Sequence, residues 1–285
     1  MAHYLDPKND LTFKRVFGEH KHLCMSLINS MLPLEKPVAS IEYQTGELIP
    51  ELANVLRHTV VDVRCTDEDG RQFIVEMQMY WTDSFRSRVL LNASKAYVRQ
   101  LDKAGKFELL HPVYALSFVN DTFEKTPEMA NEYWHHYKIV NIKDTGKQIR
   151  GLEFVFVELP KFHPQNRAEK KLRDLWLRFL TEINESTEEI PCELLDNKLI
   201  CEAVGYMESA AYTKEQLFTY DKWKIDIMTE KSALSDARGE GLKEGLKEGK
   251  REEKTEIALN MLRKGISVDD ISEMTGLSKE QIEKL

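Results

Sequence analysis

The chain has 285 residues, of which 42% are hydrophobic, and a formal net charge of −8. This composition excludes a fully disordered chain and allows one large domain or two small ones. The excess of acidic residues excludes a uniformly basic nucleic-acid binder, so any DNA contact must use locally concentrated positive charge. No stretch of about 18 apolar residues and no secretory signal occur, so we expect a cytoplasmic protein with no membrane partner.

The cysteines are far apart and form no CxxC pair. This spacing favours reduced thiols over zinc ligands or a disulfide framework. They are Cys24, Cys65, Cys192 and Cys201.

The first half of the chain predicts alternating helices and strands. Apolar residues recur at helical spacing from Asp10 to Leu32, and Pro33 ends this helix. A second helix is expected from Asp83 to Ala104, ending at Gly105. Strands are expected at residues 39–46, 58–66, 71–79, 112–119, 135–141 and 152–158.

The second half of the chain is predicted to be helical. We expect four parts: a nuclease-like domain at residues 1–165, a helical extension at 166–234, a charged Gly/Lys/Glu linker helix at 235–255 and a helix-turn-helix-like segment at 256–285. In the last part, Ser267 and Ser278 each begin a short helix with a capping pattern. Such a helical pair serves oligomerisation or DNA reading, and the mixed charge of its last helix favours oligomerisation.

Residues 58–66 and 71–79 predict a β-hairpin. If its loop is the three residues Glu68, Asp69 and Gly70, the numbers of paired residues sum to 138. Asp62 then lies opposite Glu76, and Gln78 falls on the same face as Glu76. A two-residue loop would instead put Asp62 out of phase with Glu76.

Two carboxylates that face each other across a strand pair destabilise the sheet unless something neutralises them. A divalent cation does so directly, and carboxylate oxygens suit Mg²⁺. Such an ion would activate water and stabilise charge on a phosphodiester. The alternative is that Asp62 and Glu76 are ordinary acids on a solvated face of the sheet.

The ordered motifs of the chain resemble those of the PD-(D/E)XK nuclease superfamily, and more closely its Rpn branch of recombination-promoting nucleases and transposases. Val61-Asp62 followed by Ile74-Val75-Glu76-Met77-Gln78 carries the resemblance, and it extends over most of the chain. Further matching segments are Asp10 to Gly18, Asp69-Gly70, the helix with Arg88, Tyr97, Gln100 and Leu101, then Gly105, His111 to Tyr114, and the final Thr275-Gly276-Leu277-Ser278.

The resemblance implies an α/β fold with a restriction-endonuclease-like αβββαβ core and a helical C-terminal region. It also implies a Mg²⁺-dependent DNA endonuclease, in which Mn²⁺ can substitute, linked to DNA recombination or transposable elements. Asp62, Glu76 and the backbone carbonyl of Met77 would bind the metal. Gln78 stands where the superfamily has a lysine that orients the attacking water, and glutamine carries no charge. This departure leaves open a catalytically weak or inactive module that binds DNA or protein.

Other residues complete the expected site. Lys95 or Arg88 could supply the missing positive charge, although both could equally be surface residues. Asp10 could supply a third acid or could simply be a helix N-cap. DNA phosphates could contact the basic stretch that contains Arg86, Arg88, Arg99 and Lys103, whose alternative role is a solvated helix face. The expected partners are therefore DNA and, through the C-terminal helices, further copies of the chain.

Overall fold

The computed structural model describes residues 3–44, 62–101, 106–164 and 171–285. It divides into two compact units, Met1–Lys224 and Ile225–Leu285, which are described separately below. The four-part division expected from the sequence stays a prediction.

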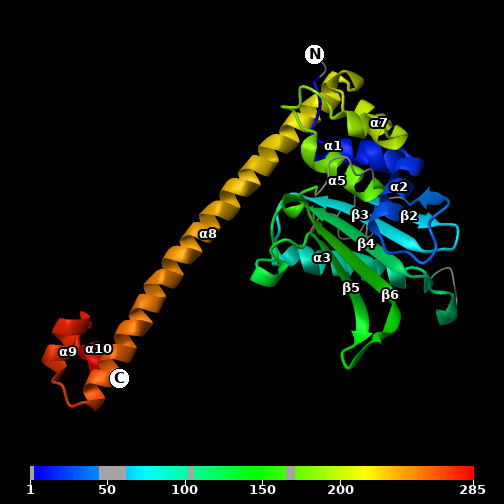
Figure 1. Ribbon diagram of the computed structural model, residues 1–285. Coiled ribbons are helices and arrows are strands. Elements are labelled where there is room, and N and C mark those ends of the chain that lie inside the picture. Colours follow the sequence, from blue (N-terminus) through cyan, green and yellow to red (C-terminus); the bar gives the residue numbers. More distant parts are fainter. Residues whose placement is uncertain (1–2, 45–61, 102–105, 165–170) are drawn as a thin grey trace. The chain divides into compact units, whose positions relative to one another are not determined.

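The first unit is built on a six-stranded sheet in the order β1-β2-β3-β4-β6-β5 (Figure 1). Strands β1 to β3 are antiparallel neighbours, β3, β4 and β6 are parallel, and β5 is an antiparallel edge strand. The apolar run of β4 is buried on both faces, as is typical of a central parallel strand. The strands are β1 (Ile41–Tyr43), β2 (Val63–Asp67), β3 (Gln72–Gln78), β4 (Val113–Val119), β5 (Trp134–Asn141) and β6 (Asp144–Glu158).

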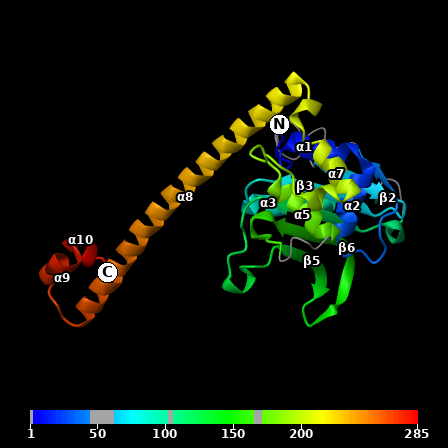
Figure 2. The same cartoon turned by 45° about the horizontal axis from the view of Figure 1, so that its top comes forward.

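One face of the sheet is covered by several helices, which are visible in both views (Figures 1 and 2). Phe13, Phe17 and Trp176 from these helices pack against Phe73 and Val75 of β3 in one large core. The helices are α1 (Asp10–Phe13), the π-helical η1 (Lys14–Gly18), α2 (Lys21–Met31), α5 (Leu172–Glu182), α6 (Cys192–Leu195) and α7 (Lys198–Gly205).

The helix expected from Asp10 to Leu32 is therefore divided into three parts. The chain takes an extended conformation at His20, and the Nδ1 of its ring donates a hydrogen bond to the carbonyl of Arg15. The hydrophobic spacing is preserved through this break, and for that reason the sequence pattern did not reveal it. The helix ends at Met31, before Pro33, as predicted.

The other face of the sheet is covered by α3 (Asp83–Val98). Thr82 caps this helix by accepting a hydrogen bond from the backbone of Phe85. Phe85 and Val89 of α3 pack on Ile74 and Phe156 in a second core. The helix ends earlier than the predicted Ala104, and residues 102–105 lie outside the described part of the chain. The order α2-β1-β2-β3-α3-β4 confirms the predicted αβββαβ core and α/β fold class.

The second unit contains α8 (Lys214–Arg263) from Ile225 onward, together with α9 (Val268–Thr275) and α10 (Lys279–Ile282). Ala258, Ile271, Leu277 and Ile282 form its core. Ser267 caps α9, and Ser278 forms a capping box with Gln281, so both expected helix starts are confirmed. Among the described helices none is long and apolar enough to cross a membrane. The remaining short helices are η2 (Phe107–Leu109), η3 (Pro127–Met129), η4 (Leu159–Lys161) and η5 (Ser209–Ala211).

Candidate active site

The β2–β3 hairpin has the three-residue loop expected from the sequence. Val63 pairs with Val75 and Arg64 with Ile74, so the paired numbers sum to 138. Gly70 has a φ of 82°, and a Cβ there would lie 2.7 Å from the ring of His111. Only glycine fits both this left-handed conformation and this close contact.

Asp62 lies one residue before β2, in a bend rather than in the strand. Its Oδ2 accepts a 2.6 Å hydrogen bond from the backbone N–H of Met77. Its Oδ1 is 3.8 Å from Nζ of Lys14, and the same Nζ lies 2.7 Å from Oδ1 of Asp10. Only 12% of the side-chain surface of Asp62 is exposed. Asp62 thus contacts β3 at Met77, the residue after Glu76, and its carboxylate also lies near Lys14 of η1.

Burial raises the pKa of Asp62 well above its ordinary value, and the neighbouring carboxylate of Asp10 adds to this rise. The N–H of Met77 and the ammonium of Lys14 oppose it. Asp10 is not the N-cap of α1, because the side chain of Asn9 takes that role by accepting from the backbone of Leu11. The carboxylate of Asp10 instead pairs with Lys14 and lies beside Asp62.

Glu76 lies on β3 with its side chain directed toward α3, and it is 5% exposed. Nδ2 of Asn92 donates to its Oε1 at 3.3 Å. Its Oε2 is buried and has no hydrogen-bond partner among the described residues. Burial raises the pKa of Glu76, while the nearby charge of Arg88 and the bond from Asn92 lower it.

Two more buried oxygens are close to Glu76 in the fold. Ser117 is the register partner of Glu76 on β4, and its Oγ has no hydrogen-bond partner in the described part of the chain. The same holds for Oδ1 of Asn92. Buried acceptors without donors are costly. The donor chemistry of Glu76 and Asp62 fits a hard divalent cation, which would satisfy such oxygens.

Gln78 is hydrogen-bonded to α3 and to the segment that follows its own strand. Nη2 of Arg88 donates to Oε1 of Gln78 at 2.7 Å, and Nε2 of Gln78 donates to the carbonyl of Tyr80 at 3.0 Å. Of the two cations considered from spacing, the structure therefore brings Arg88 to Gln78. Lys95 lies one turn beyond Asn92 on α3 and is partly exposed.

Sequence reasoning missed Asn92 and Lys14. Asn92 follows Arg88 by four residues, so the two share one face of α3. That spacing could have identified Asn92 once Arg88 was considered. Lys14 follows Asp10 by four residues in the same way.

Comparison with known families decides which family the chain belongs to. A model of the PD-(D/E)XK nuclease family transposases matches residues 7–237, which is more than half of the chain. The chain belongs to this family. The C-terminal HTH domain of the Rpn/YhgA-like nuclease family matches residues 251–285, which confirms the Rpn resemblance. No curated protein and no solved structure matches the chain.

The predicted DNA-binding residues of α3 lie in different environments. Arg86 is exposed, with its guanidinium carbon 5.1 Å from the ring centre of Trp81. Arg88 is bound to Gln78 and lies over Phe85. Arg99 is close enough to Arg64 to add to the lowering of its pKa, which burial mainly causes. Lys103 lies outside the described residues.

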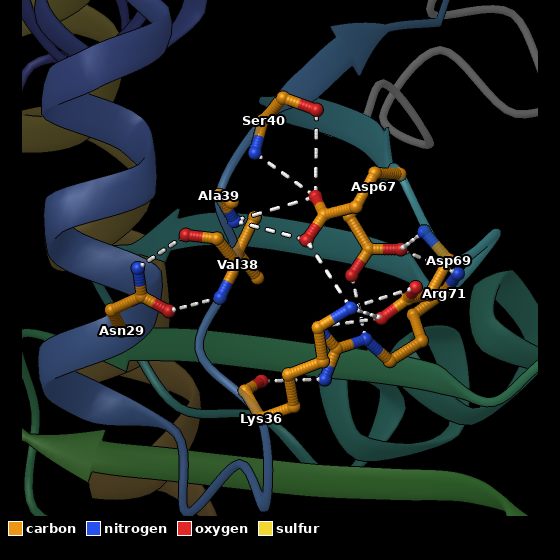
Figure 3. Close-up of polar contacts among 9 residues, drawn as sticks. Asn29, Lys36, Val38, Ala39, Ser40, Asp67, Asp69 and Arg71 are labelled. Atoms are coloured by element: carbon orange, nitrogen blue, oxygen red, sulfur yellow. Dashed lines mark hydrogen bonds and ion pairs between the residues drawn. The ribbon is translucent and has the colours of Figure 1, made fainter.

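A second group of acids lies at the turn of the same hairpin and consists of Asp67, Glu68 and Asp69. Figure 3 shows how basic side chains and backbone N–H groups surround it. Asp67 binds Nε of Arg71 at 2.6 Å, and Asp69 binds Nζ of Lys36 at 2.6 Å. Glu68 accepts from the backbone of Ser40 at 2.9 Å, and such contacts lower its pKa to about 2. These acids already bind protein groups, and their contacts stabilise the turn.

Proposed function

We propose that the chain is a Mg²⁺-dependent DNA endonuclease that hydrolyses phosphodiester bonds in DNA recombination or transposable-element biology. The observation that carries this proposal is Oε2 of Glu76, a buried carboxylate oxygen without a donor among the described residues. A second, largely buried acid, Asp62, binds the backbone N–H of the next residue, Met77. Mn²⁺ could replace Mg²⁺ because both accept carboxylate oxygens. A cytoplasmic location stays a prediction.

Asp62, Glu76 and the backbone carbonyl of Met77 are the proposed metal ligands. In β3, the N–H of Gln72 and the carbonyl of Gln78 bond toward β4. Backbone groups alternate in direction, so those of Met77 face the β2 side, where its N–H already binds Asp62. The carbonyl of Met77 is therefore on the same side of β3 as Asp62. A bound ion would supply a nucleophilic water and neutralise developing charge on the phosphate.

The chain's own residues position the reactants. Arg88 supplies the positive charge that the lysine of the family pattern would carry, and it fixes the amide of Gln78. The second amide hydrogen of Gln78 is available to orient the attacking water. Asp10 is the third acid of the site, and Lys14 partly neutralises it and Asp62. Lys95, Arg86, Arg99 and Lys103 would contact DNA phosphates.

A plasmid-nicking assay tests the proposal. Wild type should nick supercoiled DNA with Mg²⁺, leave 5′-phosphate ends and be inactive in EDTA. Asp62→Asn keeps an acceptor for Met77 but loses the charge, and Glu76→Gln does the same for Asn92. Each should lower the rate by about 10³-fold or more, because a metal ligand supplies several kcal/mol of transition-state stabilisation.

Asp83→Asn, an exposed acid at the start of α3, is the matched control and should nick at the wild-type rate. Equal nicking by wild type and Asp62→Asn would contradict the catalytic assignment.

Thermal unfolding gives a readout that does not need activity. An ion present at about ten times its Kd stabilises the folded state by about 1.4 kcal/mol, which raises the Tm of a unit of this size by about 3–6 °C. Mg²⁺ or Mn²⁺ should therefore raise the Tm of wild type but not of Glu76→Gln. An equal rise in both proteins would place the ion elsewhere.

The second candidate function is a catalytically weak or inactive module of the same fold that binds DNA or protein. It is favoured by Gln78, which is uncharged and whose amide oxygen and nitrogen already bond to Arg88 and Tyr80. DNA binding by wild type without any nicking at saturating Mg²⁺ and Mn²⁺ would select this function.

We also propose that the C-terminal helices join copies of the chain. Exposed apolar side chains such as Leu242, Leu246 and Met274 occur on α8 and α9. A chain truncated after residue 234 should sediment as a smaller assembly than the full chain. An unchanged oligomeric state would remove this idea and leave DNA reading as the role of α9 and α10.

A further inference from the structure

Strands β5 and β6 continue past the rest of the sheet as a two-stranded ribbon. The first residue of β6 that pairs with β4 is Leu152, so the part of β6 before it pairs only with β5. We call residues 138–151 the arm. Every residue from 141 to 150 is exposed, and both views show the ribbon extending from the sheet (Figures 1 and 2).

The arm is basic although the chain is acidic. It contains Lys138, Lys143, Lys147 and Arg150 against one acid, Asp144, which gives a net charge of +3 in a chain of −8. Lys147 pairs with Asp144 at 3.4 Å and Arg150 with Glu35 at 3.2 Å. Both pairs are exposed, and exposed ion pairs contribute little to stability. These cations can therefore exchange their partners for phosphate at low cost.

The arm also exposes isoleucine side chains beside these cations. Ile139 lies opposite Ile149 in the ribbon register, and the two are 44% and 72% exposed. Ile142, at the turn between the strands, is 90% exposed. Large apolar side chains exposed this fully on one projecting element mark a contact surface rather than a packing requirement.

We propose that the arm binds duplex DNA, with its cations on the phosphates and its isoleucines against groove surfaces. A two-stranded ribbon fits the major groove, and apolar side chains also wedge between base steps. A second copy of the chain is the less suitable occupant of the arm, because pairing two arms of charge +3 brings like charges together. DNA offers the complementary charge. This binding does not depend on the proposed cleavage reaction.

The arm leaves the sheet at the end opposite the site. Glu76 is level with Ser117 and Phe156 across the parallel strands, and Phe156 is 13 residues from Lys143 along β6. At about 3.3 Å per residue this is at most about 43 Å, or about 13 base pairs. The arm would thus hold DNA about one helical turn away from the cleaved bond.

Binding of a fluorescein-labelled 30-base-pair duplex to the full chain, measured by anisotropy in EDTA, tests the arm without cleavage. The variant K143E/K147E/R150E should bind at least about 100-fold more weakly at 50 mM salt. The slope of log affinity against log salt should fall by about 3, because each phosphate contact contributes about 0.9.

The variant K125E/K198E/K214E is the matched control. It makes the same charge change at three exposed lysines outside the arm, and it should stay within about threefold of wild type. Ile142→Ala should weaken binding at every salt concentration without changing the slope, because an apolar contact releases no counterions. All variants should keep the wild-type Tm, since the substituted side chains are exposed.

Three outcomes would overturn the proposal. The first is an equal loss of affinity in the two triple variants. The second is wild-type affinity in the arm variant together with a smaller sedimenting species, which would make the arm a contact between copies. The third is no binding of the duplex by wild type.

Discussion

The two ends of the β2–β3 hairpin both carry acids, but their surroundings differ. At the turn, Asp67, Glu68 and Asp69 bind Arg71, Lys36 and backbone N–H groups. At the open end, Asp62 and Glu76 are buried and have raised pKa values, and Glu76 keeps one oxygen without a donor in the described residues.

On the proposed function, this difference makes closeness of acids a poor guide to a metal site. The turn acids are the tighter group in space, yet protein partners already neutralise them. The acids at the open end are buried and are not fully neutralised by protein groups, so a bound cation would stabilise their charge. The four predictions below test this contrast.

The largest expected effect on folding stability is at the turn. Asp67 has no exposed side-chain surface and binds Arg71 together with two backbone N–H groups. Asp67→Asn should lower the free energy of unfolding by about 3 kcal/mol, because it leaves a nearly buried guanidinium without its closest charge partner. Asp62→Asn should not lower it in EDTA at pH 7. Urea unfolding measures the stability of both variants. Equal destabilisation by Asp67→Asn and Asp62→Asn would contradict the proposed difference between the two ends of the hairpin.

The next effect is on cleavage through Arg88. Arg88→Gln removes the charge beside Gln78 and should lower the nicking rate by about 100-fold, which is the usual size for loss of one transition-state donor. Arg88→Lys should recover part of the rate. Arg86→Gln removes only a proposed phosphate contact on the exposed face of α3 and should lower the rate much less, by about threefold. Similar losses at both arginines would show that α3 acts only through general phosphate binding.

A smaller effect is expected at Asn92, a positioning residue for Glu76. Asn92→Ala removes a hydrogen bond to the carboxylate and should lower kcat by about tenfold and raise the Mg²⁺ concentration needed for half-maximal activity. Ser94→Ala, whose hydroxyl bonds only to Leu90 within α3 in the described contacts, should leave both quantities unchanged. A loss of kcat with no change in Mg²⁺ requirement would argue against this role.

The smallest effect is a pH dependence of stability in EDTA. An acid whose pKa is raised on folding makes the folded state less stable as pH rises above its ordinary pKa of about 4. The double variant Asp62→Asn/Glu76→Gln lacks this penalty. Its Tm minus that of wild type should therefore be near zero at pH 4 and positive at pH 7, and Mg²⁺ should reduce the difference. A difference that does not vary with pH would mean that the two acids ionise without penalty.

The sequence was sufficient for the hairpin because the signals are local. Gly70 fixes a three-residue loop, and alternation along the strand then sets the register of Glu76 and Gln78. The αβββαβ order followed from the resemblance and from hydrophobic periodicity, and the structure has the same order.

The residues that contact the site could not be predicted from the sequence in the same way, because they come from distant segments of the chain. Lys14 reaches Asp62 from a π-helical turn 48 positions earlier in the chain, and only tertiary packing brings them together. From their spacing along α3, Arg88 and Lys95 were equally good candidates for the missing positive charge. The packing of α3 on β3 brings Arg88 to Gln78. Of the arm, only residues 138–141 fell within a predicted strand, because the strand expected at residues 152–158 begins at Asp144 in the structure. The extension of this strand past the sheet depends on where β4 begins.

Asp62 has a second duty that is independent of any ion. Its carboxylate occupies the place next to β3 where a backbone carbonyl would otherwise continue the ladder, and it satisfies the N–H of Met77. Homologues that have lost cleavage would still need a hydrogen-bond acceptor at position 62, but they would no longer need a charged side chain at position 76. An aspartate at position 62 alone would therefore not indicate nuclease competence in a natural variant, whereas the loss of the charge at position 62 or position 76 would indicate that cleavage is lost.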